Sequence, residues 1–161
     1  MRYETPQDIA NEANTAAQIA KQTNSTHHKV PLHYEVYCDF AFERDGEICA
    51  FCEIKHRHIP GEWGSYPDII LSAHKWLKGK ELFRSTGIPW LFAVAIENND
   101  ASEIWCYRVD ADTIDDNFKI SWGGRTKNRR RNADVEPVVH IPADLFKRCS
   151  RFVRVQPEVN Q

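Results

Sequence analysis

Two carboxylates and one amine near the middle of the chain are spaced so that adjacent strands could bring them together. Asp39 lies in one β-like run, and Glu53 and Lys55 flank Ile54 in the next. Phosphodiester hydrolysis needs a divalent cation held by oxygen ligands, a positioned water and nearby positive charge. The carboxylates and the Ile54 carbonyl could ligate the cation, and Lys55 could orient or deprotonate the water. The same residues could also be solvated charges on an ordinary sheet, because D-x(n)-E-x-K patterns are common.

The element that positions these residues is a predicted β-hairpin around Asp45-Gly46. Alternation gives its two strands the following apolar residues: Tyr34, Val36, Cys38, Phe40 and Phe42, then Ile48, Ala50, Cys52 and Ile54. Asp39 then lies on the polar side of the first strand, and Glu53 and Lys55 on the polar side of the second. A two-residue type I′ turn would pair Asp39 with Cys52 and separate the carboxylates. A shared site therefore requires a three-residue loop with its glycine left-handed, or a β-bulge.

Further helices and strands are predicted on both sides of this hairpin. The helix start Thr5-Pro6-Gln7-Asp8 predicts a helix over residues 6–22, followed by the polar connector "TNSTHHK". Pro67 is expected to begin a second helix that reaches about Arg84. The apolar run "PWLFAVAIEN" is typical of a strand buried on both faces, and "EIWCYRVD" pairs with it. A short strand "PVVHI" and a closing helix begun by Pro142 and Asp144 complete an α/β sandwich.

The first predicted helix carries a carboxylate on its apolar face. At 100° per residue, Glu12 falls inside the arc formed by Ile9, Ala13, Ala16, Ile19 and Ala20. Such a carboxylate either lies at the edge of the arc and reaches water, or serves a site. Both alternatives are open on the sequence alone.

Together these features resemble the PD-(D/E)xK nuclease superfamily. The resemblance consists of Asp39, thirteen further residues and Glu53-Ile54-Lys55, with a helix before them and a helix and strand after them. It covers about residues 6–110 and implies a restriction-endonuclease-like αβββαβ core, with a mixed central sheet flanked by helices. Cys38 departs from the proline that the superfamily name expects before the aspartate.

Two branches of the superfamily suggest additional site residues. In Holliday-junction-resolvase-like nucleases an acidic residue on the first helix joins the metal site, which implies that role for Glu12. In virus-type replication-repair nucleases a polar or basic residue on the helix after the E-x-K strand contributes. That place could be filled by Ser72, His74 or Lys75.

Basic residues gather toward the C-terminus. The loop over residues 123–132, "GGRTKNRRRN", contains Arg125, Lys127, Arg129, Arg130 and Arg131, and the predicted closing helix contains Lys147, Arg148, Arg151 and Arg154. A solvated charge run is the default interpretation, but segregated basic patches in a nearly neutral chain favour contact with a phosphate backbone. We therefore assign DNA contact to the loop residues and to Lys75. Trp63 and Tyr66 could stack on an unpaired base, although covering the core is the commoner role.

Composition limits the class of protein. With 161 residues, 42% hydrophobic content and a net charge of −2, the chain suits one domain over residues 1–161 and is not a wholly basic nucleic-acid binder. We expect the core, the basic loop and a C-terminal strand-helix appendage within that domain. No segment approaches the roughly 18 apolar residues of a membrane span, which predicts a soluble, cytoplasmic protein. Five cysteines form no evident disulfide framework, which fits a reducing compartment.

The function predicted from these residues is that of a Mg²⁺-dependent DNA endonuclease or DNA-processing nuclease. Mn²⁺ should substitute, and two subunits could act together as a homodimer. The expected metal site comprises Asp39, Glu53, the Ile54 carbonyl and Glu12, with Lys55 acting on water and phosphate. The main alternative is a non-catalytic nucleic-acid-binding or partner-binding module on the same fold.

A third alternative is a zinc-stabilised interaction domain. It rests on Cys49 and Cys52, whose sulfurs would point to opposite faces of a regular strand, and no second cysteine pair accompanies them. The sequence leaves open the structure and sequence of the DNA substrate. It assigns no role to His27 or His28.

Overall fold

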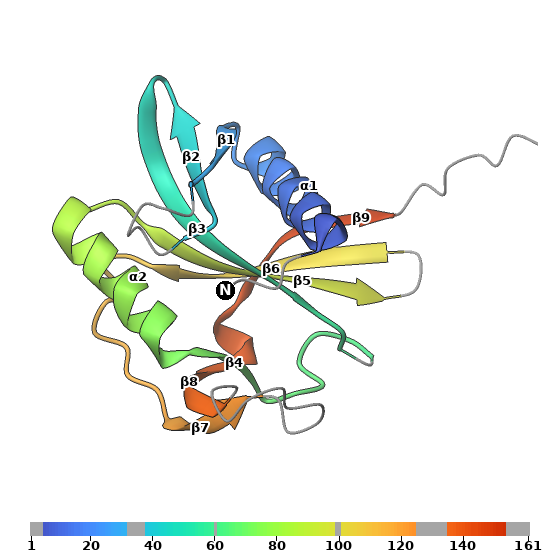
Figure 1. Ribbon diagram of the computed structural model, residues 1–161, viewed down its shortest axis with the longest axis vertical. Coiled ribbons are helices and arrows are strands. Elements are labelled where there is room, and N and C mark those ends of the chain that lie inside the picture. Colours follow the sequence, from blue (N-terminus) through green and yellow to red (C-terminus); the bar gives the residue numbers. More distant parts are fainter. Residues whose placement is uncertain (1–4, 32–37, 60, 99–100, 125–134, 154–161) are drawn as a thin grey trace, which may run out of the picture.

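The computed structural model describes residues 5–31, 38–59, 61–98, 101–124 and 135–153, which form two sheets and two helices (Figure 1). In chain order the elements are α1 (Pro6–Gln22), β1 (Thr26–Lys29), β2 (Phe40–Arg44), β3 (Glu47–Arg57), β4 (Asp68–Ser72), α2 (Ala73–Thr86), β5 (Trp90–Asn98), β6 (Ala101–Val109), β7 (Ile120–Gly124), β8 (Val135–Pro142), a 3₁₀ turn (Ala143–Leu145) and β9 (Lys147–Val153). The larger sheet has the strand order β1-β2-β3-β5-β6-β9, and the smaller sheet has the order β4-β8-β7.

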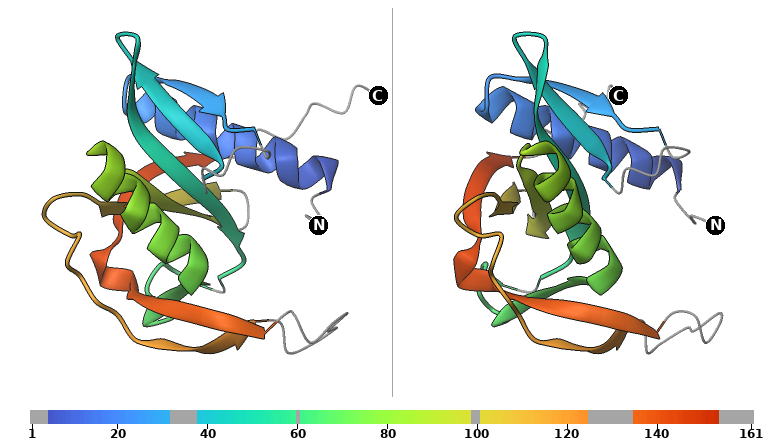
Figure 2. Two further views of the ribbon diagram at one scale, coloured as in Figure 1. Left: turned by 60° about the vertical axis from the view of Figure 1, so that its left-hand side comes forward. Right: turned by 90° about the vertical axis from the view of Figure 1, so that its left-hand side faces the viewer.

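The six-stranded sheet is covered on both faces. One face packs against α1, where Ala16 and Ile19 meet Phe40, Cys52 and Ile54. The other face packs against α2 and the small sheet, in a larger cluster around residues such as Trp76, Trp90, Phe92, Tyr107 and Ile141. Figure 2 shows the two helices on opposite sides of this sheet. The mixed α/β fold, with an αβββαβ core, is therefore confirmed.

Helix α1 begins and ends as its sequence predicts. The Thr5 side chain accepts a hydrogen bond from the Asp8 N–H, and the Asp8 carboxylate accepts one from the Thr5 N–H. This capping box satisfies two amide groups that the first turn would leave without partners. Neither α1 nor α2 has the length and apolar character of a membrane-spanning helix.

The first three strands form an antiparallel meander that differs in part from the prediction. The expected connector contains β1, which pairs with β2 from Thr26 opposite Glu43 to Lys29 opposite Phe40. The described part of β2 begins only at Phe40, because residues 32–37 lie outside the described ranges. Cys38 belongs to the cluster under α2, whereas Phe40 and Phe42 face α1. The predicted single apolar face from Tyr34 to Phe42 is therefore wrong at Cys38, which precedes the strand.

A helical crossover joins β3 to the parallel strand β5, with Glu53 opposite Phe92 and Lys55 opposite Val94. The second helix does not begin at Pro67 as predicted, because residues Asp68–Ser72 form β4 and pair with β8. Helix α2 begins at Ala73 and is continuous through Gly79, whose backbone lies against Trp90. A Cβ atom at this position would lie 2.4 Å from Trp90 Cδ2, so the close approach of α2 to β5 requires glycine here.

The C-terminal part of the chain differs most from its prediction. The expected closing helix is a 3₁₀ turn followed by β9, so Lys147, Arg148 and Arg151 lie on a strand paired with β6. β8 is the predicted short strand, and β7 beside it was not predicted. A disulfide joins Cys106 on β6 to Cys149 on β9, whereas the sequence predicted no disulfide framework.

Candidate active site

The β2–β3 hairpin combines a two-residue turn with a β-bulge. Arg44 pairs with Glu47, and Asp45 and Gly46 both have positive φ, at 53° and 80°. Pairing then shifts between Phe42 and Glu43, so that Cys49 is the extra residue and Phe40 lies opposite Cys52. This is one of the two arrangements that a shared site requires. It brings Asp39 level with Glu53 instead of Cys52.

Asp39 is fixed by its main chain and its side chain at the point where β2 begins. Its N–H donates to the Cys52 carbonyl at 2.8 Å, and its own carbonyl accepts from the Val30 N–H at 3.0 Å. The carboxylate Oδ2 accepts from the Ile54 N–H at 2.8 Å, where a continuing strand would place a backbone carbonyl. The side chain therefore lies at the edge of β3 next to the E-x-K residues.

The Asp39 side chain is 2% exposed, and this burial makes its carboxylate harder to ionise. Burial raises its pKa to about 6, and the charges of Glu53 and Glu12 act in the same direction. The Ile54 N–H and the Lys55 ammonium oppose this rise. Two buried carboxylates that repel each other are a feature of sites that bind cations.

Glu53 projects from the face of β3 that is covered by α2, and it is 1% exposed. Its Oε1 accepts from Lys55 Nζ at 3.1 Å and from Lys75 Nζ, which α2 brings over the strand. Burial lowers the pKa of Lys55, but the charge of Glu53, the hydrogen bonds with Lys75 and Glu53 and the charge of Asp39 together leave this pKa raised. Burial lowers the pKa of Lys75, and neighbouring Lys55 lowers it further. Two lysines of different proton affinity thus share one carboxylate oxygen.

Glu12 is buried on α1, as expected for the apolar arc, with an exposed fraction of 9%. Its Oε2 lies 3.1 Å from Lys29 Nζ on β1. Spacing along the chain does not predict this partner, because Lys29 falls in the expected connector "TNSTHHK". Glu12 is near enough for its charge to raise the Asp39 pKa, so α1 contributes to the electrostatics of the site.

The remaining polar candidates lie apart from the two carboxylates. Ser72 Oγ donates to Glu136 on β8, and His74 is exposed. His28 lies 3.2 Å from Glu43, and His27 contacts the Phe40 ring. The basic loop, with Arg125, Lys127, Arg129, Arg130 and Arg131, lies outside the described residues.

The donor atoms at Asp39 and Glu53 fit a hard divalent cation. Both lysine contacts use Glu53 Oε1, so neither uses Oε2. The Ile54 carbonyl points to the same side of β3 as the N–H that donates to Asp39, because both groups of one strand residue face the same neighbour. Within the described ranges, no three His, Cys, Asp or Glu side chains form a metal-ligand group. The Ile54 carbonyl and water would therefore have to complete the coordination.

The C-x-x-C residues lie in an apolar environment. Cys52 is fully buried against α1, and Cys49 packs on the same cluster. The prediction that their sulfurs face opposite sides is wrong, because the bulge at Cys49 changes the alternation. Burial raises the pKa of Cys52 well above its ordinary value, which disfavours the thiolate that zinc requires.

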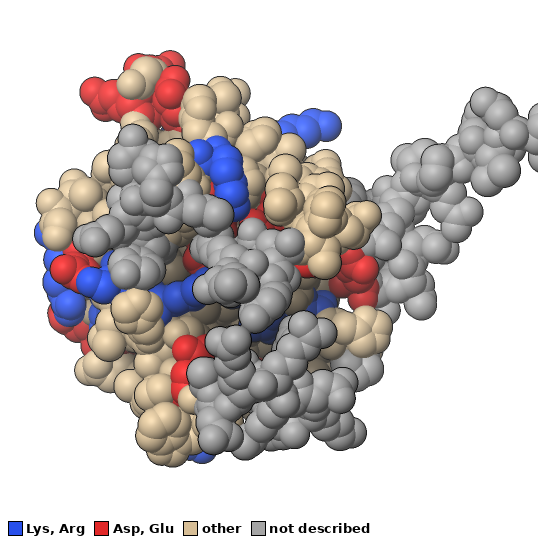
Figure 3. Space-filling model, in the orientation of Figure 1, with Lys and Arg blue, Asp and Glu red and all other residues tan. Residues whose placement is uncertain are grey.

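Acidic side chains gather at one tip of the molecular surface. Figure 3 shows red side chains at the tip of the β2–β3 hairpin and blue side chains, with some red beside them, toward the centre of the same face. The tip carries Glu43, Asp45 and Glu47. A polyanion would be repelled at this tip.

Comparisons with known proteins identify the family of the chain. No curated protein matches the chain. Among solved structures, the chain is similar to Hjc, a Holliday junction resolvase of the archaeal hyperthermophile Archaeoglobus fulgidus, with 13% identity and a TM-score of 0.45 over 83% of this chain and 88% of that chain. The model of a family described as "Phage putative PDDEXK endonuclease" matches residues 1–149, a range that includes Glu12, Asp39, Glu53 and Lys55. The chain therefore belongs to this PDDEXK endonuclease family.

Proposed function

We propose that the protein is a metal-dependent deoxyribonuclease that uses Mg²⁺, or Mn²⁺ in its place. Asp39, Glu53 and the Ile54 carbonyl would hold the cation, which when bound would supply Lewis acidity at a phosphoryl oxygen. Glu12 would assist from α1, directly or through water. The observation that carries this proposal is the pair of almost fully buried carboxylates, Asp39 and Glu53, side by side at the edge of one strand.

That pair is costly unless positive charge compensates it. Burying a second carboxylate next to the first raises the free energy of the folded state, as the elevated pKa of Asp39 shows. Two lysines and a backbone N–H offset part of this cost. A divalent cation would offset the remainder and would also make the arrangement useful for hydrolysis.

The two lysines at Glu53 suit different tasks in the reaction. Lys55 follows Glu53 on the same strand face and would orient the attacking water and contact the phosphate. Lys75 approaches from α2 and has a lowered pKa, so it deprotonates more readily than an ordinary lysine. It would donate or accept a proton near the reacting phosphate and contribute to DNA contact. The basic loop around Arg125–Arg131 would add affinity for the DNA backbone.

Cleavage of labelled DNA tests the proposal. Linear duplex, branched duplex and single-stranded substrates are incubated with Mg²⁺, Mn²⁺ or EDTA. Lys55→Ala and Asp39→Asn should each abolish cleavage, and Asp39→Asn alone should weaken Mn²⁺ binding measured by calorimetry. Lys78→Ala on the same helix as Lys75 is the control, because Lys78 pairs with Glu81 away from the site. Cleavage at the wild-type rate by both Lys55→Ala and Asp39→Asn would refute the assignment.

The alternative is a non-catalytic DNA-binding module on the same fold. It predicts DNA binding without Mn²⁺ affinity and without cleavage of any of the three substrates. Size-exclusion chromatography with light scattering would determine in the same experiments whether the protein acts as a homodimer.

A further inference from the structure

Arg57 continues the line of charged residues on the active face of β3. Glu53, Lys55 and Arg57 occupy alternate positions, opposite Phe92, Val94 and Ile96 of β5. Alternate residues of a strand share one face and are separated by about 6.6 Å. Arg57 therefore lies one step beyond Lys55, in the direction away from Glu53.

The guanidinium of Arg57 differs from the other cations near the site in its partners. Lys55 and Lys75 contact Glu53, and Lys29 contacts Glu12. Among the described residues, Arg57 donates a hydrogen bond to the carbonyl of its neighbour His56 at 3.2 Å and forms no ion pair with a described carboxylate. Burial lowers the pKa of the Arg57 guanidinium. No described carboxylate offsets this cost of removing the charge from water. A half-buried guanidinium of this kind favours an external anion.

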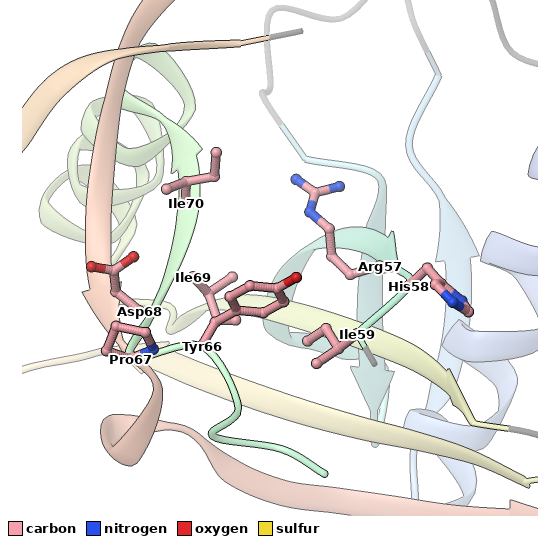
Figure 4. Close-up of a pocket in the computed structure, with 8 residues that line it drawn as sticks. All are labelled: Arg57, His58, Ile59, Tyr66, Pro67, Asp68, Ile69 and Ile70. Carbon is pink, nitrogen blue, oxygen red and sulfur yellow. The ribbon is translucent and has the colours of Figure 1, made fainter. Parts of the chain in front are cut away.

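Arg57 borders a cavity of about 340 Å³ between the end of β3 and the start of β4. The cavity is lined by Arg57, His58, Ile59, Tyr66, Pro67, Asp68, Ile69 and Ile70. Figure 4 shows the Tyr66 ring extending from its loop into this space, toward the strand end that carries Arg57. Asp68 lies 3.3 Å from His140 Nδ1 on β8, so its carboxylate has a partner of its own.

The two aromatic residues of this loop have different roles in the structure. Trp63 stacks on Trp105 with ring centroids 4.9 Å apart and donates to the Ala143 carbonyl, so it covers the core. Tyr66 is 50% exposed and presents its ring to the cavity. Tyr66 is therefore available to a ligand, and Trp63 is not.

We propose that this cavity binds one unpaired nucleotide next to the scissile phosphate, with its base against Tyr66 and its phosphate on Arg57. The inference rests on the proposed nuclease function, because it takes the Glu53–Lys55 face as the place of cleavage. A volume of about 340 Å³ is at the lower end of the range for small-molecule sites and suits one base. A base stacked inside a duplex cannot enter it, so the substrate class is DNA with an unpaired nucleotide at the cut, such as a flap or branch point.

The test measures DNA binding in EDTA, so that it does not depend on cleavage. Three probes are compared by fluorescence anisotropy: a fully paired duplex, the same duplex with a one-nucleotide flap, and that flap with an abasic residue. Wild type should bind the flap about 5- to 150-fold more tightly than the abasic flap, the range expected for stacking of one base. Tyr66→Ala should lose this difference, and Tyr66→Phe, which keeps the ring, should retain it.

Arg57 is tested with the same probes. Arg57→Ala should weaken binding of the two flap probes and lower their salt slope by about one unit, as expected for one phosphate contact. Arg108→Ala is the matched control, because Arg108 pairs with Asp110 and lies opposite Leu91, near the other end of β5. Equal effects of the two arginine substitutions would overturn the phosphate contact.

Other outcomes separate this inference from the proposed function. No preference of wild type for the base-containing flap, or equal losses in Tyr66→Phe and Tyr66→Ala, would overturn base binding in the cavity. Cleavage in Mg²⁺ without that preference would overturn the cavity proposal alone. Preference without cleavage of any probe would support the cavity and overturn the catalytic assignment.

Discussion

Replacing Asp39 with asparagine should make the metal-free protein more stable at neutral pH, although it removes a proposed metal ligand. Asp39 is 2% exposed, and burial together with the charge of Glu53 raises the pKa of its carboxyl from 3.8 to about 6. The folded state therefore disfavours the ionised carboxylate. Asparagine can still offer an oxygen to the Ile54 N–H but has no charge to desolvate.

The size of the effect follows from the pKa difference between the folded and unfolded states. One pKa unit corresponds to about 1.4 kcal/mol, so a rise of about two units destabilises wild type by roughly 3 kcal/mol when Asp39 is ionised in both states. Because the folded-state pKa is the higher one, this cost is absent below the unfolded pKa, grows as the pH rises, and is complete above about pH 6. Asp39→Asn should therefore exceed wild type by up to about 3 kcal/mol at pH 8 and by about half as much at pH 5.

Urea unfolding in EDTA at pH 8 and pH 5 measures this difference in the free energy of unfolding. Glu62→Gln serves as the control, because Glu62 is an exposed acid in a loop and should show no gain at either pH. The reasoning is refuted if Asp39→Asn is no more stable than wild type at pH 8. It is also refuted if the gain is the same at both pH values.

Three further substitutions test other parts of the structure. Gly79→Ala should lower the free energy of unfolding by about 1–2 kcal/mol in urea titrations, because a clash with Trp90 outweighs the better helix propensity of alanine; an increase would contradict the close approach of α2 to β5. Thr5→Ala should cost about 1 kcal/mol in the same assay through loss of the capping box, and an unchanged value would mean that α1 frays at this end. Replacing Arg129, Arg130 and Arg131 with alanine should weaken binding to all DNA sequences alike and reduce the salt slope by about one unit per lost contact; an unchanged slope would identify the loop as a solvated surface.

The sequence was most informative where local signals and tertiary packing agree. Helix α1 has a cap, a proline in the first turn and an apolar arc, and each of these is satisfied within the element or by one neighbouring sheet. The unbroken apolar run of β5 indicated a strand buried on both faces, and the structure confirms this. The irregularity of the hairpin also followed from the sequence. A shared site at Asp39 and Glu53 requires one residue more than a regular two-residue hairpin can pair, either in the loop or in a bulge.

The sequence was misleading where a helix-start signal preceded a strand. Pro67-Asp68 and Pro142-Ala143-Asp144 both have the composition of a first helical turn, yet β4 follows the first and a 3₁₀ turn and β9 follow the second. Ile69 and Leu71 alternate with exposed Ile70, a period of two that favours a strand. Edge strands of this kind form because a partner strand is available, and that information is not local.

The candidate active site also depends on contacts that are not local in the sequence. Spacing predicted that Asp39, Glu53 and Lys55 could meet, but the contact of Lys75 with Glu53 depends on how α2 crosses the sheet. The pairing of Lys29 with Glu12 depends on β1, a strand of only four residues with no strong pattern. Neither contact could be derived from spacing along the chain, because each joins elements from different layers of the fold.

The β-bulge at Cys49 makes the site vulnerable to a change that removes none of its functional groups. Of the thirteen residues between Asp39 and Glu53, ten pair across the hairpin, and Asp45, Gly46 and Cys49 do not. If the hairpin kept Cys49 but paired regularly from its turn, without the bulge, Asp39 would lie opposite Cys52, and every catalytic side chain would still be present but on mismatched faces. Deleting Cys49 itself would remove the odd residue and leave Asp39 opposite Glu53 in a regular hairpin. Length changes in this hairpin are therefore constrained by parity: adding one residue to each strand between the turn and the site keeps Asp39 opposite Glu53, whereas adding one residue to a single strand does not.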